Sequence, residues 1–135
     1  MRLLLVTVGR LRAPYEDDVA HYRKLLSRYT RLEEVELRDG EDVERRLPER
    51  AFVSLLADGG QSYDSRAFSR FLEERRMDGR DLAFVIGGAF GLELACPDHR
   101  LSLGPMTLPH QLARVVLLEQ LYRAHKLLAG APYHH

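Results

Sequence analysis

The hydrophobic positions of this chain follow two spacings, one typical of strands and one typical of helices. Leu3–Val8 and Leu82–Ile86 are short and almost wholly apolar, which predicts strands buried on both faces, with Leu82–Ile86 central. Leu32–Leu37 alternates apolar and charged side chains, as a half-buried strand does. Two further strands are expected at Ala51–Leu56, ended by Asp-Gly-Gly, and near Arg100–Leu103.

Helical spacing occupies the segments between these strands. Pro14–Tyr29 repeats apolar residues at helical intervals. A second helix is expected to begin at a cap formed by Ser62 or Asp64 and to end at Gly79. A short helical turn is expected around Leu92–Cys96. The order of strands and helices predicts a single α/β domain with a mostly parallel sheet covered on both faces.

The last expected helix is apolar on two sides. One stripe contains Ala113, Leu117, Leu121, Ala124 and Leu128, and a second face contains Leu112, Val115, Val116 and Tyr122. In a domain this small, the second burial is most simply against another copy of the chain. We therefore expect a homodimer, with Leu117 or Leu121 facing the partner.

Composition restricts the class of protein. With 135 residues, of which 45% are hydrophobic, the chain can bury one core, so residues 1–135 are expected to form one domain. It has neither an apolar run long enough for a membrane span nor a signal peptide, which favours a cytoplasmic protein without a membrane partner. A net charge of zero removes the general attraction to nucleic acid, so DNA is not expected and an RNA must meet a local patch. The single cysteine, Cys96, is expected in the core, and no metal site is expected.

Three loops at the carboxyl ends of the expected strands are rich in glycine and proline. Their sequences are L-A-D-G-G, G-G-A-F-G and L-G-P-M-T-L-P. In a parallel sheet, ligands bind outside these strand ends, so the loops predict a nucleotide-sized pocket. The alternative is that the glycines only allow tight turns. The dinucleotide and P-loop fingerprints are absent, which argues against a Rossmann dehydrogenase and a P-loop nucleotidase.

Several motifs together resemble the RlmH family of ribosomal large subunit methyltransferases, in the SPOUT superfamily. They are V-G-R-L-R-A-P-Y, H-Y-R-K-L-L-S-R-Y, D-G-R-D-L-A-F-V-I-G-G-A-F-G-L, L-S-L-G-P-M-T-L-P-H-Q-L-A-R-V-V-L-L-E-Q-L-Y-R-A and the closing P-Y-H. The resemblance implies an α/β fold with a C-terminal trefoil knot, an exception to the rule that chains are unknotted. It also implies a homodimer and S-adenosylmethionine as methyl donor. The implied acceptor is N3 of pseudouridine 1915 in the 23S rRNA of the large subunit or the whole ribosome.

The resemblance also implies which residues bind the methyl donor. They come from the loops after the third and fourth strands and from the segment before the last helix: Leu55, Leu56, Gly87, Gly88, Gly104, Pro105, Met106, Thr107, Leu108 and Pro109. A bulky residue at Gly88 is expected to fill the adenosine site and leave the fold intact. His110 either orients the loop or touches the substrate.

The resemblance places the chemistry of the acceptor at the C-terminus. His134 is the first candidate for the base that manages the N3 proton, and Tyr133 is expected to stack on or hydrogen-bond the pyrimidine. His135 replaces the arginine or lysine of the family, which leaves its phosphate contact without a permanent charge. Arg114 and Arg123 are expected either to contact phosphate or stabilise developing charge, or to form ion pairs within the protein.

The sequence departs from the family pattern at two places, and one of them leaves a second hypothesis open. The segment between the second and third strands is shorter than in many members, which is expected to affect only the periphery. The replaced terminal cation allows a second hypothesis, a non-catalytic module of the same fold that binds RNA or the ribosome. An enzyme using another nucleotide has less support because the fingerprint motifs are missing.

Overall fold

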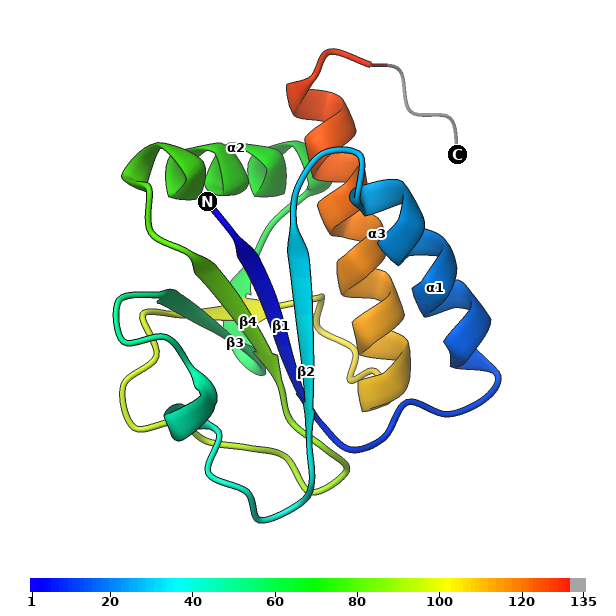
Figure 1. The fold of residues 1–135 in the computed structure, drawn as a ribbon, viewed down its shortest axis with the longest axis vertical. Coiled ribbons are helices and arrows are strands. Elements are labelled where there is room, and N and C mark those ends of the chain that lie inside the picture. The colour runs from blue at the N-terminus through cyan, green and yellow to red at the C-terminus, as the bar shows by residue number, and fades with distance from the viewer. Residues whose placement is uncertain (132–135) are drawn as a thin grey trace.

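The protein forms a five-stranded sheet with three helices (Figure 1). The structure is a computed structural model, and it describes residues 1–131. The strands are β1 (Leu3–Val8), β2 (Leu32–Leu37), β3 (Phe52–Ser62), β4 (Leu82–Ile86) and β5 (His99–Ser102). They lie in the order β2-β1-β4-β3-β5, and all four pairings are parallel. The expected parallel α/β architecture is confirmed.

The three helices are α1 (Tyr15–Leu26), α2 (Ser65–Asp78) and α3 (His110–Leu128). Asp64 caps α2 by accepting a hydrogen bond from the backbone N–H of Ala67 at 2.7 Å. Gly79 ends the helix in the left-handed conformation, with a φ of 86°. Of the two predicted caps, Asp64 is therefore correct, and the predicted end at Gly79 is confirmed.

The helices all pack on one face of the sheet. Alternate side chains of the central strands, such as Leu5 and Phe84, point to this face and form a core with α1, α2 and α3. Within residues 1–131, no α-helix covers the opposite face. There Val6 and Val85 pack against Val43 and other side chains of irregular segments. The sheet is thus covered on both faces as expected, but one cover consists of connections and a single 3-10 turn at Glu44–Arg46.

Strand β3 is longer than expected. The residues Asp-Gly-Gly, which predict the end of a strand, lie inside it, and pairing with β5 resumes at Gln61 after a shift in register. At Gly60 a Cβ atom would lie 2.7 Å from the backbone carbonyl carbon of Arg100, so the two strands approach too closely for any other residue. The glycine therefore permits close pairing here instead of ending the strand.

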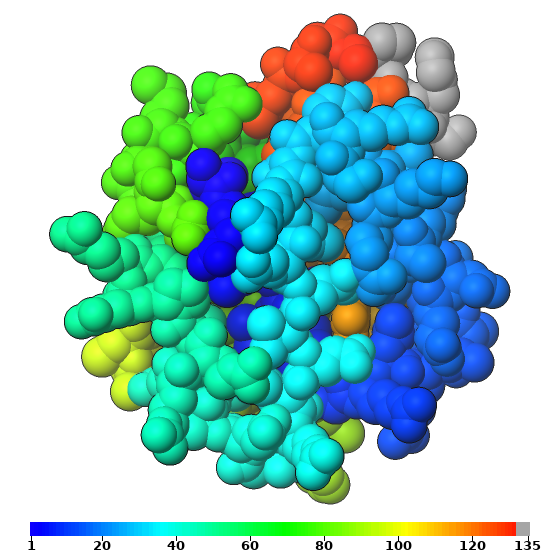
Figure 2. All heavy atoms as spheres, in the orientation of Figure 1, coloured from blue at the N-terminus to red at the C-terminus, as the bar shows by residue number. Residues whose placement is uncertain are grey.

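Helix α3 lies between α1 and α2 and forms much of the core. Leu117 and Leu121 are almost fully buried within the protomer, so the expectation that one of them faces a partner is wrong. Leu112, Val116 and Leu127 are half-buried and lie outside the three core clusters of the described residues. In the space-filling view, α1 and β2 cover most of α3 on the near side (Figure 2).

Two smaller expectations are also wrong. The segment Leu92–Cys96 contains no helical turn, because Leu92 and Leu94 insert into the core as an irregular chain. Cys96 is exposed instead of buried. Across residues 1–131, no helix has the length and apolar character to cross a membrane.

Candidate active site

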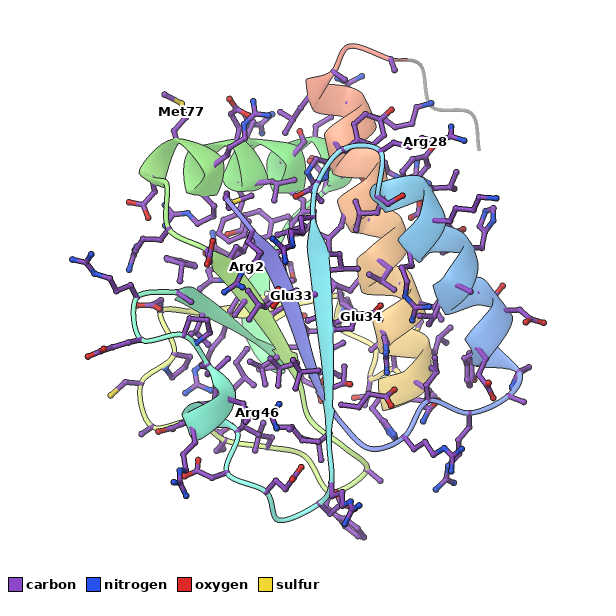
Figure 3. The ribbon with its side chains drawn as sticks, viewed as in Figure 1. Arg2, Arg28, Glu33, Glu34, Arg46 and Met77 are labelled. Atoms are coloured by element: carbon purple, nitrogen blue, oxygen red, sulfur yellow. The ribbon has the colours of Figure 1, made fainter. Side chains whose placement is uncertain are left out.

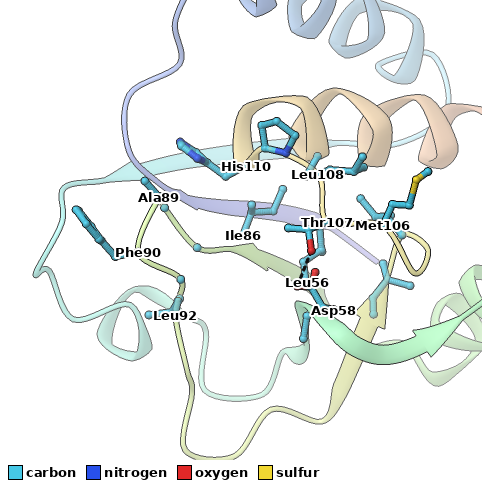
Figure 4. Close-up of a pocket in the computed structure, with 18 of the residues that line it drawn as sticks. Leu56, Asp58, Ile86, Ala89, Phe90, Leu92, Met106, Thr107, Leu108 and His110 are labelled. Carbon is cyan, nitrogen blue, oxygen red and sulfur yellow. Dashed lines mark hydrogen bonds between the residues drawn. The ribbon is translucent and has the colours of Figure 1, made fainter.

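A large cavity opens at the carboxyl ends of β3, β4 and β5. Its volume is about 980 Å³. Residues 56–58 of β3, the glycine-rich loop after β4 and the loop between β5 and α3 form it together with the first turn of α3 (Figure 4). Because β3, β4 and β5 are parallel neighbours, the loops that follow them converge at this edge. We call this space the donor cavity.

Most residues predicted to bind the methyl donor line this cavity. They are Leu56, Gly87, Gly88, Gly104, Met106, Thr107, Leu108 and Pro109. Ile86 and Leu101 add apolar walls from the strands. Residues that the sequence prediction took from three separate segments, one strand and two loops, therefore lie around one space.

Leu55 and Pro105 are exceptions. Leu55 is fully buried and packs on the opposite face of the sheet, beside Val6 and Val85. Successive side chains of a strand point to opposite faces, so Leu55 and Leu56 cannot both face the cavity. Pro105 is exposed and is not part of the lining.

The two glycines after β4 have a steric role within the protein. At Gly87 a Cβ atom would lie 2.8 Å from Cβ of Leu92, which is too close for any side chain to be added without a shift. At Gly88 it would lie 3.2 Å from both the carbonyl oxygen of Val8 and Oδ1 of Asp39. A side chain at Gly88 would therefore press on β1 and Asp39. The expectation that it fills the adenosine site without affecting the fold does not agree with this geometry.

Asp58, Glu93 and Phe90 line the cavity without having been assigned from the sequence. Asp58 accepts a hydrogen bond from the hydroxyl of Thr107 at 3.1 Å, and Glu93 is exposed nearby. Phe90 is 93% exposed and Met106 is 76% exposed, at opposite ends of the cavity (Figure 4). Asp58 belongs to the L-A-D-G-G segment that was expected at the pocket, but only Leu55 and Leu56 of this region were assigned to the donor.

His110 begins α3 at the junction of the donor cavity with a smaller one. The second cavity has a volume of about 270 Å³ and shares Gly88, Ala89 and His110 with the first. Residues between Gly9 and Ala13 form its outer wall together with Tyr15, Asp39 and Gln111. His110 can therefore contact molecules in either space, so both of its predicted roles remain compatible with its position.

Arg114 lies away from both cavities. Its guanidinium group is buried and pairs with Glu34 at 3.0 Å and Glu36 at 2.8 Å, while Thr7 accepts a further hydrogen bond at 3.3 Å. Burial acts to raise the pKa of Glu34, but hydrogen bonds from Arg23 and Arg114 outweigh it and hold the pKa below its ordinary value. Of the two roles predicted for Arg114, the ion pair within the protein is the one that this placement supports, and a substrate contact is not available.

The other predicted catalytic residues have different placements. Arg123 is mostly buried on α3 and pairs with Glu119 at 3.0 Å, one turn before it. Tyr133, His134 and His135 lie outside the described residues. Among residues 1–131, no group of three or more histidine, cysteine or acidic side chains is arranged to hold a metal ion.

Comparison with known proteins decides the family. The sequence model described as "Predicted SPOUT methyltransferase" matches residues 1–134. The chain belongs to the SPOUT methyltransferase family. This agrees with the parallel sheet and with the resemblance noted from the motifs, and it makes the donor cavity the candidate active site of a SPOUT methyltransferase.

Relatives of this SPOUT methyltransferase cover nearly the whole chain. "Ribosomal RNA large subunit methyltransferase H" of Solidesulfovibrio magneticus is 47% identical, over 98% of this chain and 98% of its own. The protein of the same name from Streptococcus gordonii is 38% identical over 99% of each chain. That from Gluconacetobacter diazotrophicus is 43% identical over 96% of this chain and 95% of its own.

Proposed function

We propose that this protein transfers a methyl group from S-adenosylmethionine to N3 of pseudouridine 1915 in 23S rRNA, within the assembled ribosome. The observation that carries the proposal is the donor cavity, formed by residues of β3 and by the loops after β4 and β5 in a SPOUT methyltransferase. The names of the relatives support a ribosomal RNA as the acceptor. A net charge of zero agrees with recognition of an assembled ribosomal surface by shape. A substrate of this kind implies a cytoplasmic location.

The residues of the donor cavity fit this methyl donor. Its volume of about 980 Å³ is at the upper end of the range for small-molecule sites, which is roughly 300–1,000 Å³. Apolar side chains such as Ile86 and Leu108 can enclose the adenosine, and the carboxylates of Asp58 and Glu93 can meet positive charge. When bound, S-adenosylmethionine supplies a methyl group on a sulfonium, and the electrons of the broken S–C bond stay on sulfur.

The protein must then orient the acceptor and manage one proton. The N3 nitrogen forms the new bond to the methyl carbon and loses its hydrogen, which His134 accepts directly or through water. Tyr133 orients the pyrimidine, and His135 contacts phosphate when charged. Arg123, on the last helix, remains a candidate for stabilising the charge that develops on the base. The loops and His110 exclude water from the reacting atoms.

We propose a homodimer through the outer face of α3. Leu112, Val116 and Leu127 follow one side of that helix at helical spacing, are half-buried and lie outside the core clusters of the described residues. The ion pair between Glu119 and Arg123 lies on the same side. A second copy of the chain offers the same mixed face, which makes a symmetric contact possible. The trefoil knot remains a prediction from the family.

Two measurements test the proposal. Titration calorimetry is expected to show one molecule of S-adenosylhomocysteine bound per protomer. Ribosomes lacking the methyl group are expected to receive it from S-adenosylmethionine when the protein is added. Binding to ribosomes without binding to the donor or methyl transfer would favour the non-catalytic module instead.

A further inference from the structure

One wall of the second cavity is a loop that contains no regular hydrogen-bonded structure. This loop, residues 9–13, leaves β1 through Gly9, whose φ is 104°, and reaches α1 at Tyr15. Loops of this kind are usually the mobile parts of a domain unless other elements hold their backbone. The wall of the second cavity therefore depends on contacts from outside the loop.

Gln111 supplies two of these contacts from the first turn of α3. Its side-chain oxygen accepts a hydrogen bond from the N–H of Arg12 at 2.8 Å, and its side-chain nitrogen donates to the carbonyl oxygen of Arg10 at 2.6 Å. Each end of the amide is thus matched to one backbone group. These contacts join residues that are about one hundred positions apart in the sequence.

Glu36 supplies the third contact from the end of β2. One of its carboxylate oxygens accepts a hydrogen bond from the N–H of Leu11 at 3.2 Å, and the same oxygen lies 2.8 Å from the buried guanidinium of Arg114. The backbone of residues 10, 11 and 12 is therefore held from two elements. Figure 3 shows Glu34, the neighbouring member of this network, on the side of β2 nearest the helices.

The side chains of this loop give the second cavity its chemical character. Arg10 and Arg12 line it and are exposed, and among residues 1–131 neither guanidinium group forms an ion pair. Asp39 and Tyr15 add hydrogen-bonding groups to the wall. Free guanidinium groups beside a small polar cavity fit a nucleotide whose base enters the cavity and whose phosphates remain outside. The shared residues Gly88, Ala89 and His110 would bring that base next to the donor cavity.

We propose that the second cavity receives the acceptor nucleotide of the RNA and that Gln111 is a positioning residue that holds the outer wall of this cavity. The inference rests on the proposed function, because it assigns the acceptor side of the same reaction. Gln111 acts through the backbone of loop 9–13 and does not itself need to touch the RNA. Gln111 does not line the donor cavity, so we expect donor binding to be independent of it.

Steady-state methylation of ribosomes by the full-length chain tests the positioning role. Gln111→Ala removes both hydrogen bonds and is expected to raise KM for ribosomes roughly tenfold, the effect of losing one or two hydrogen bonds. Its affinity for S-adenosylhomocysteine should stay within twofold of the wild type. The matched control is Gln61→Ala, an exposed glutamine on β3 outside both cavities, which should leave KM unchanged.

A second variant tests the cavity without touching the hydrogen bonds. Ala13→Leu adds volume to the wall and is expected to raise KM for ribosomes by a similar factor, whereas Ala20→Leu on the exposed side of α1 is the control. Arg12→Ala should also lower the slope of log affinity against log salt by about one, compared with Arg70→Ala on α2.

The outcomes separate this inference from the proposed function. If the wild-type protein methylates ribosomes while Gln111→Ala and Ala13→Leu keep the wild-type KM, the acceptor lies elsewhere and only the present inference is wrong. If both variants lose donor affinity together with ribosome affinity, Gln111 has a general structural role and the inference is also wrong. A wild-type protein that methylates no ribosomal RNA would overturn both proposals.

Discussion

The guanidinium group of Arg114 lies 3.0 Å from the carboxylate of Glu34, at a position where only 6% of the arginine side chain is exposed. The contact joins the last helix to β2, the edge strand of the sheet. Glu34 also pairs with Arg23 of α1, so three elements meet at one carboxylate. This arrangement places a helix arginine in the interior of the protein, where it holds the fold together and cannot reach RNA.

Replacing Arg114 tests this structural role. Arg114→Leu leaves the carboxylates of Glu34 and Glu36 without their shared partner and is expected to lower the free energy of unfolding by about 3 kcal/mol. This value is at the lower end for a broken buried ion pair, because Arg23 still contacts Glu34. Arg31→Leu is the control, since Arg31 is 79% exposed and its contact with Glu33 should contribute less than about 1 kcal/mol. Urea denaturation measures both. Equal effects of the two substitutions would show that the buried network is not stabilising.

The same carboxylate predicts how stability changes in acid. Arg23 and Arg114 hold the pKa of Glu34 below the ordinary value of 4.5, so its stabilising effect is complete above 4.5 and is lost as pH falls through the folded-state pKa. Glu34→Gln should be less stable than the wild type at neutral pH, and the difference should shrink below pH 4.5. Denaturation measured across pH would contradict this if the gap stayed constant. Burial also lowers the pKa of His99 and His125, which reduces stability below pH 6.5 in both proteins alike.

The sequence pattern predicted the regular core well, and the errors have identifiable causes. Strand β1 and strand β4 were located to the residue because continuous apolar runs between turn residues have few alternative structures. Strand β3 was predicted too short because glycine was taken as a strand end. At Gly60 the glycine instead allows β5 to approach, and this is a tertiary requirement that local sequence does not encode.

The dimer proposal predicts a surface effect at α3. Val116→Glu introduces a charge into the half-buried stripe, so the protein should become monomeric. The monomer should remain folded and still show a cooperative thermal transition. Met77→Glu, at a position 81% exposed on α2, is the control and should leave the assembly unchanged. Sedimentation equilibrium measures the mass. A wild-type protein that is monomeric at micromolar concentration would show that the stripe has no symmetric partner.

The tail makes a separate prediction about catalysis. Deleting residues 133–135 should leave donor binding and dimerisation almost unchanged and reduce methylation severely, because positioning and proton transfer act in the transition state. His135→Arg restores the cation of the family and should preserve or raise activity, with less loss at higher pH. Calorimetry and a ribosome methylation assay measure these properties. Normal methylation by the shortened protein would exclude Tyr133 and His134 from the chemistry.

The candidate site shows what motifs can and cannot supply. Residues from the three predicted segments line one cavity, but the motifs did not distinguish Leu55 from Leu56. Which of two successive strand residues faces the cavity depends on the packing of the two faces of the sheet. They also treated Arg114 as a possible RNA contact, since the sequence does not show that Glu34 and Glu36 lie opposite it. The role of Gln111 depends on hydrogen bonds to Arg10 and Arg12, which lie about one hundred positions earlier in the sequence. The local sequence around Gln111 does not predict these contacts.

The central claim is that this SPOUT methyltransferase methylates a pseudouridine of ribosomal RNA. The most direct measurement uses S-adenosylmethionine with a deuterated methyl group and ribosomes from cells that lack the enzyme, followed by mass spectrometry of 23S rRNA fragments. The account predicts one deuterated methyl group, on N3 of pseudouridine 1915, in the presence of the protein and none in its absence. A protein that binds the donor but leaves this nucleotide unlabelled, or labels a different one, would contradict the account.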